Sequence, residues 1–197
     1  MNRRIKITGI LLLGILLLNP SVFAATYKVD PDHSTVSFKI RHILSNIQGY
    51  FRQFEGSFEY DPAKPETWKA EATIQAASID TNVEKRDNHL RSADFFDVAK
   101  YPTITFVSAG ASDITVTSAK LNGILTMHGV EKPVVLDLEI LGEVKDPWGN
   151  KIASFTATTT INRKDFGIEW NKALETGQLL VGEEVTITLE IAGLLQG

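Results

Sequence analysis

The chain has 197 residues, a formal net charge of −4 and no cysteine. Its size is enough for one sizeable domain but small for two, and its acidic balance without a basic patch argues against a nucleic-acid partner. Without cysteine the chain has neither disulfides nor the thiol to which a bacterial lipoprotein attaches its lipid, so its stability must come from buried apolar surface.

Residues 1–24 have the layout of a cleavable secretory signal. Arg3, Arg4 and Lys6 precede a twelve-residue, largely apolar run from Ile7 to Leu18, and small residues follow around Ala24. The run is shorter than the roughly 20 residues of a membrane-spanning helix. We therefore expect cleavage before Ala25 and an exported chain, residues 25–197, that forms one domain with net charge −7 and no membrane span.

Most of the remaining chain alternates between apolar and polar residues, which is typical of strands with one buried face. The alternating stretches are 36–41, 54–60, 70–76, 103–106, 121–127, 134–140, 154–161 and 185–191. Turn residues separate several of them, notably 146–150 and a turn expected from Gly129 to Pro133. About eight short antiparallel strands indicate a barrel or a sandwich.

The polar face of these strands carries charge, as at Lys39, Glu55, Glu59, Glu71 and Glu139. An outer-membrane barrel needs an apolar outer face, so this pattern excludes that class and directs the apolar face inward. An eight-stranded barrel can hold either a packed core or one small or elongated ligand. Periodicity alone leaves both interiors open.

One stretch interrupts the strand pattern. Residues 86–91 are densely charged, Phe95 and Phe96 follow, and Pro102 hands the chain to the next strand. We predict a short helical insertion near residues 84–99.

Seven motifs in order resemble the YceI-like family. They lie at 32–42, 49–56, 78–81, 86–90, 94–102, 125–130 and 162–167, and the similarity runs from about Tyr27 to Leu194. The resemblance implies an extended, lipocalin-like, eight-stranded antiparallel barrel that holds a long-chain isoprenoid or similar amphiphilic lipid in an apolar tunnel. It also implies a periplasmic protein, often a homodimer.

The expected ligand-binding residues fall into two groups. The apolar lining candidates are Phe38, Ile40, Phe51, Phe54, Phe58, Ile74, Leu90, Phe95, Phe96, Phe106, Leu125, Leu136, Leu138 and Phe155. The alternative for each is an ordinary core position. Arg86, Asp87 and His89, with Arg91, could hold a polar head group at a tunnel mouth, because arginine and histidine donate to phosphate or carbonyl oxygens. Helix capping and local salt bridges are the alternative for these charged residues.

No pattern indicates catalysis, a metal or a cofactor. The four histidines, at 33, 42, 89 and 128, lack the spacing of a helical zinc site, and Gly-x-Ser-x-Gly and glycine-rich phosphate loops are absent from the sequence. We therefore expect a periplasmic carrier or store of a lipid. The alternatives are a lipid-modifying enzyme that uses His89 and Asp87, and a protein-interaction module without a ligand.

Overall fold

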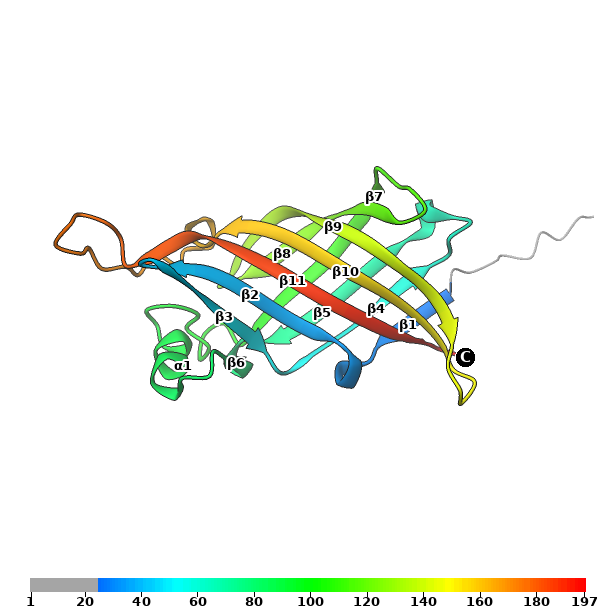
Figure 1. Ribbon diagram of the computed structural model, residues 1–197, viewed down its shortest axis with the longest axis horizontal. Helices are drawn as coiled ribbons and strands as arrows, with labels where there is room; N and C mark the ends of the chain where they lie inside the picture. The colour runs from blue at the N-terminus through cyan, green and yellow to red at the C-terminus, as the bar shows by residue number, and fades with distance from the viewer. Residues whose placement is uncertain (1–24) are drawn as a thin grey trace, which may run out of the picture.

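The computed structural model describes residues 25–197, so the predicted signal lies outside the described residues. The described chain is mainly β, with one α-helix at one end of an elongated barrel (Figure 1). Its strands are β1 Ala25–Val29, β2 Thr35–His42, β3 Ser45–Phe51, β4 Phe54–Tyr60, β5 Lys69–Gln75, β6 Ile79–Asp80, β7 Thr103–Ser112, β8 Ser118–Met127, β9 Val130–Lys145, β10 Lys151–Asn162 and β11 Val181–Leu195.

Eight strands close an antiparallel ring in the order β1-β4-β5-β7-β8-β9-β10-β11, and pairing of β1 with β11 completes it. β11 pairs with β1 through Gly193 to Leu195 and with β2 through Val181 to Glu190. β1 and β2 are thus successive parts of one barrel strand, which the 3-10 turn η1 Pro31–His33 interrupts. β3 and β6 extend the sheet beyond β2. The predicted eight-stranded antiparallel barrel is confirmed.

The predicted inward faces are also confirmed, most clearly on β8. Leu121, Gly123, Leu125 and Met127 are buried inside the barrel, whereas Ile124 between them is exposed. Side chains of a strand point to alternate faces, so a period-two apolar pattern is enough to predict which residues face inward.

The two predicted hairpin turns have different outcomes. At 146–150, Asp146 Oδ1 accepts hydrogen bonds from the backbone N–H groups of Trp148 (2.9 Å) and Asn150 (2.8 Å), as expected of a turn. The prediction of a turn from Gly129 to Pro133 is wrong. The turn between β8 and β9 consists of His128 and Gly129 alone, with φ of 53° and 75°. Pro133 lies within β9 instead. β10 pairs only with residues 137–145 of β9, so the N–H that proline lacks interrupts no pairing between β9 and β10.

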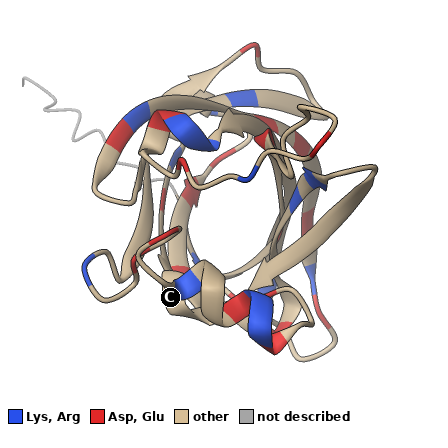
Figure 2. Ribbon diagram, turned by 90° about the vertical axis from the view of Figure 1, so that its left-hand side faces the viewer, with Lys and Arg blue, Asp and Glu red and all other residues tan. Residues whose placement is uncertain are grey.

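The helical insertion is shorter than predicted. α1 spans Glu84–Arg91 and ends because Ser92 adopts an extended backbone, with its N–H bonded to the carbonyl of His89. The following residues form turns rather than a continued helix, and the backbone N–H of Phe96 donates to Leu90 O at 3.0 Å. Viewed along the barrel, α1 and its charged residues lie at the rim of one end (Figure 2).

The other end of the interior is filled by side chains. Tyr27, Phe58, Tyr60, Trp68 and Phe155 are all buried there and form what we call the aromatic cluster. The rings of Tyr27 and Phe58 stack at 5.2 Å between centroids, and Phe58 meets Phe155 edge-on at 5.3 Å. The open part of the interior therefore lies between this cluster and α1.

Candidate functional site

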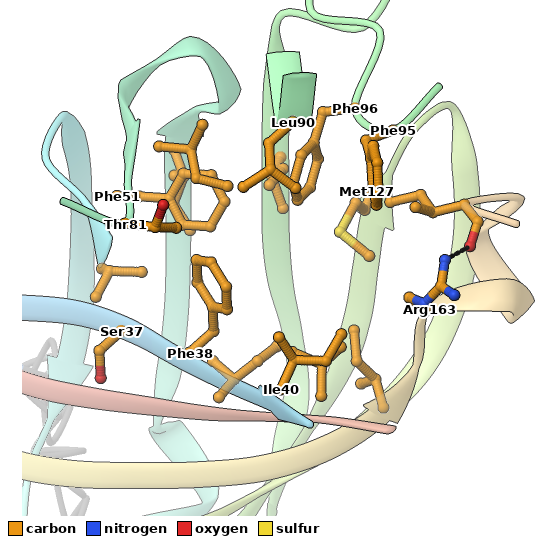
Figure 3. Close-up of a pocket in the computed structure, with 18 of the residues that line it drawn as sticks. Ser37, Phe38, Ile40, Phe51, Thr81, Leu90, Phe95, Phe96, Met127 and Arg163 are labelled. Carbon is orange, nitrogen blue, oxygen red and sulfur yellow. Dashed lines mark hydrogen bonds between the residues drawn. The ribbon is translucent and has the colours of Figure 1, made fainter. Parts of the chain in front are cut away.

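A cavity of about 580 Å³ occupies the barrel between the aromatic cluster and α1. This volume is typical of a site for one small-molecule or lipid ligand. Phe38 and Ile40 on β2 point into it from one side, opposite Leu90 and Phe96 from the α1 segment (Figure 3). The sequence-predicted residues on its wall are Phe38, Ile40, Phe51, Phe54, Ile74, Arg86, His89, Leu90, Phe95, Phe96, Phe106, Leu125 and Leu136.

Four predicted site residues lie off the cavity wall. Phe58 and Phe155 belong to the aromatic cluster, and Leu138 packs against it. Asp87 is buried behind the wall, bonded to Thr81. Alternation predicts that a residue points inward, but its height along the barrel depends on the register of neighbouring strands, which placed the three apolar residues in the filled end.

The last turn of α1 and the turns that follow it form an apolar roof over the cavity. Leu90, Phe95 and Phe96 project from it into the interior (Figure 3). Phe96 meets Phe51 of β3 edge-on with centroids 5.7 Å apart, so the roof packs directly on the barrel wall. Two adjacent aromatic residues, Phe95 and Phe96, can both face the cavity here because the backbone turns between strands instead of following a strand.

The charged residues of α1 hold the backbone of the residues that precede the helix. The buried carboxylate of Asp87 accepts hydrogen bonds from the Thr81 backbone N–H, at 2.9 Å, and from its hydroxyl. Arg86 donates to the Thr81 hydroxyl and carbonyl, both at 2.7 Å. Arg91 donates to the carbonyls of Ala77 and Ile79, each at 2.7 Å. These residues attach α1 to the chain that leads into it.

His89 lies on the cavity wall between two aromatic rings. Its ring meets those of Phe95 and Trp170 edge-on, with centroids 5.0 and 4.9 Å away. Its Nε2 lies 2.9 Å from Asp94 Oδ2, whereas the carboxylate of Asp87 is bonded to Thr81. The structure therefore brings His89 and Asp87 to one short helix without pairing them.

Two of the other histidines, His33 and His128, contact acceptors within the protein. His33 Nδ1 lies 2.7 Å from Asp30 Oδ2, and His128 Nδ1 lies 3.0 Å from the carbonyl of Phe166. Within residues 25–197, no group of three or more histidine, aspartate or glutamate side chains is placed to hold a metal ion. The same part of the chain holds no helix long and apolar enough to cross a membrane.

Sequence reasoning missed a second set of cavity residues. It includes Met127, Ile161, Arg163, Ile168, Trp170, Val181, Val185, Ile187 and Leu189. The alternation of apolar and polar residues along β11 predicts that Val185, Ile187 and Leu189 face inward. Ile168 and Trp170 lie outside the strands, between η4 Arg163–Phe166 and β11, where no periodicity marks a residue as inward-facing.

A closed antiparallel barrel with an apolar interior cavity and a helical segment at one end defines a class of lipocalin-like proteins. The YceI-like domain matches residues 27–193, and the chain belongs to this family. It is 42% identical over 179 residues to a UPF0312 protein of Ectopseudomonas mendocina, covering 88% of this chain and 94% of that relative.

Two solved structures share the fold. BcnA of Burkholderia cenocepacia superimposes with a TM-score of 0.74 at 25% identity, covering 83% of this chain and 98% of that one. A polyisoprenoid binding domain from Saccharophagus degradans has a TM-score of 0.63 at 15% identity, covering 88% of this chain and 99% of that one.

Proposed function

We propose that the protein binds one long-chain isoprenoid or similar amphiphilic lipid in the cavity and carries or stores it without changing it chemically. The observation that carries this proposal is the apolar cavity enclosed by a complete barrel and roofed by Leu90, Phe95 and Phe96. The polyisoprenoid named for the Saccharophagus domain, which shares the fold, supports this choice of ligand class.

The energetics favour a long chain. Each buried CH₂ contributes about 0.8 kcal/mol on leaving water, so a five-carbon isoprene unit contributes roughly 4 kcal/mol gross. Association costs about 4–15 kcal/mol, so several units must be enclosed before binding is tight. A membrane also shields such a chain from water, so the advantage of the cavity is shielding while the lipid crosses an aqueous compartment.

Export to the periplasm and assembly as a homodimer are parts of the same proposal. Residues 1–24 and the family resemblance support the first, and the family resemblance supports the second. Mature protein from a periplasmic fraction is expected to begin at Ala25, and analytical ultracentrifugation is expected to give twice the chain mass. An uncleaved cytoplasmic chain or a monomer at high concentration would contradict these two parts separately.

A matched pair of isoleucines tests the binding proposal. Ile40 points into the cavity (Figure 3). Ile124 is 41% exposed on the outside of β8. Ile40→Trp should fill part of the cavity and abolish binding of geranylgeraniol in native mass spectrometry. Ile124→Trp adds the same bulk outside and should bind like the unchanged protein. Equal binding by both variants, or no binding of isoprenoids or fatty acids by the unchanged protein, overturns the proposal.

A further inference from the structure

Arg163 is a buried cation on the cavity wall. It begins η4, directly after β10, and is only 4% exposed. Nε donates to the carbonyl of Gly182 at 2.8 Å and Nη1 to that of Ile168 at 2.7 Å. Among residues 25–197, its third nitrogen, Nη2, is buried with no hydrogen-bond partner. A buried donor without an acceptor is costly, so this nitrogen needs an explanation.

Within the described part of the chain, no counter-ion is bonded to the charge of Arg163. Both of its acceptors are neutral carbonyl oxygens. The nearby Glu183 carboxylate accepts a hydrogen bond from Lys164. Burial lowers the pKa of the Arg163 guanidinium, and the negative charge of Glu183 offsets part of that effect. Because a buried cation is stable only when paired, an anion is the partner this site lacks.

Three other polar residues beside the cavity, Thr81, Arg86 and His89, already have partners within the protein. The hydroxyl of Thr81 is bonded to Asp87 and Arg86, and Arg86 also holds the Thr81 carbonyl. His89 is paired with Asp94. Arg163 differs from these groups because a buried donor remains unused, on the same side of the cavity as Met127 (Figure 3).

We propose that Arg163 binds the anionic oxygen head group, a phosphate or a carboxylate, of the lipid in the cavity. The chain of the lipid then extends from η4 toward the aromatic cluster. This inference rests on the proposed function, because it assigns the polar end of the same ligand. It is an alternative to the head-group role that the sequence suggested for Arg86, Asp87 and His89.

Two matched lipid pairs test the assignment: geranylgeranyl phosphate against geranylgeraniol, and hexadecanoate against hexadecanol. The unchanged, delipidated protein should bind the anion of at least one pair roughly 10- to 100-fold more tightly than its alcohol, as expected for a hydrogen bond to a charged group. The pair with the larger ratio distinguishes phosphate from carboxylate. Arg163→Met should abolish the preference and leave alcohol binding intact.

Arg91→Met is the matched control. All three guanidinium nitrogens of Arg91 are engaged, with Ala77, Asn88 and Ile79, and the residue lies off the cavity wall. This variant should lose stability but keep the preference for the anion. A folded Arg163→Met protein that still prefers the anion, or an unchanged protein without any preference, overturns the head-group assignment.

A second measurement avoids dependence on the folding of the variant. In the unchanged protein, the guanidinium ¹⁵N resonances of Arg163 should shift on titration with the preferred anion and much less with its alcohol. Resonances that respond equally to both overturn the inference. Failure of every lipid to bind would instead overturn the proposed function, whereas equal binding of anion and alcohol overturns only the role of Arg163.

Discussion

The ring of Phe38 lies over Gly49, its cross-strand partner in the β2–β3 hairpin. A Cβ added to Gly49 would lie within 3.0 Å of two ring atoms of Phe38 and of the Thr81 side chain. Gly49 is therefore required because an aromatic side chain occupies the space that a larger residue would need, which is the arrangement known as aromatic rescue of a strand glycine.

Gly49→Ala should destabilise the protein by about 1–3 kcal/mol, because overpacking forces Phe38 from its rotamer. Chemical denaturation measures the change in the free energy of unfolding. The double variant Gly49→Ala/Phe38→Leu should recover part of the loss, since the shorter side chain leaves room for the added methyl group. Simple additivity of the two substitutions would contradict this explanation.

Asp87→Ala should lower the free energy of unfolding by about 1–3 kcal/mol, because it leaves the buried Thr81 N–H and hydroxyl without their acceptor. Amide hydrogen exchange should show α1 opening more often than the barrel strands. Glu84→Ala, at an exposed position of the same helix, is the control and should change stability little. A loss at Glu84 as large as that at Asp87 would argue against a specific bracing role.

Alanine substitutions of two phenylalanines should distinguish the filled part of the interior from the cavity. Phe155→Ala removes a ring from the aromatic cluster and should cost about 3–5 kcal/mol of stability. Phe96→Ala removes a partly buried ring from the cavity roof, so it should cost less stability and weaken lipid binding more. Thermal unfolding and lipid titration of both variants test the contrast, and identical profiles would refute it.

The Asp30–His33 pair predicts a local pH dependence. The hydrogen bond that the His33 ring donates to the Asp30 carboxylate raises the pKa of His33 above its ordinary value and lowers the pKa of Asp30. The stabilisation from His33 is complete below its unfolded pKa of about 6.5 and is lost as pH rises through the raised folded value. The contribution of Asp30 is lost as pH falls through its depressed pKa. NMR titration should show the raised His33 pKa, and Asp30→Asn should return it toward 6.5.

The sequence predicted the barrel well because its main signal is local. In β8, the alternation of Leu121, Leu125 and Met127 with polar or exposed residues reports directly which side faces inward. The height of a residue along the barrel is not local. Phe54 lies on the cavity wall and Phe58, on the same face of the same strand, lies in the aromatic cluster, because strand pairing determines what each ring meets.

The polar part of the site was harder to predict. Arg86 and Arg91 bond to backbone carbonyls of residues 77–81, and nothing in the sequence reports the direction of those carbonyls. Arg163 follows a strand in a charged stretch, Arg163 to Asp165, that resembles any exposed turn. Its burial results from closure of β11 over η4, where Gly182 supplies a carbonyl from the far end of the chain.

If the cavity serves lipid binding, the protein should hold a lipid in the cell. The most direct measurement is organic extraction of the protein purified from its native host, followed by mass spectrometry of the extract and of the intact protein. We expect one long-chain isoprenoid or similar amphiphile per chain, and none in the Ile40→Trp variant. Repeated recovery of lipid-free protein, with the cavity closed by side chains in its crystal structure, would contradict it.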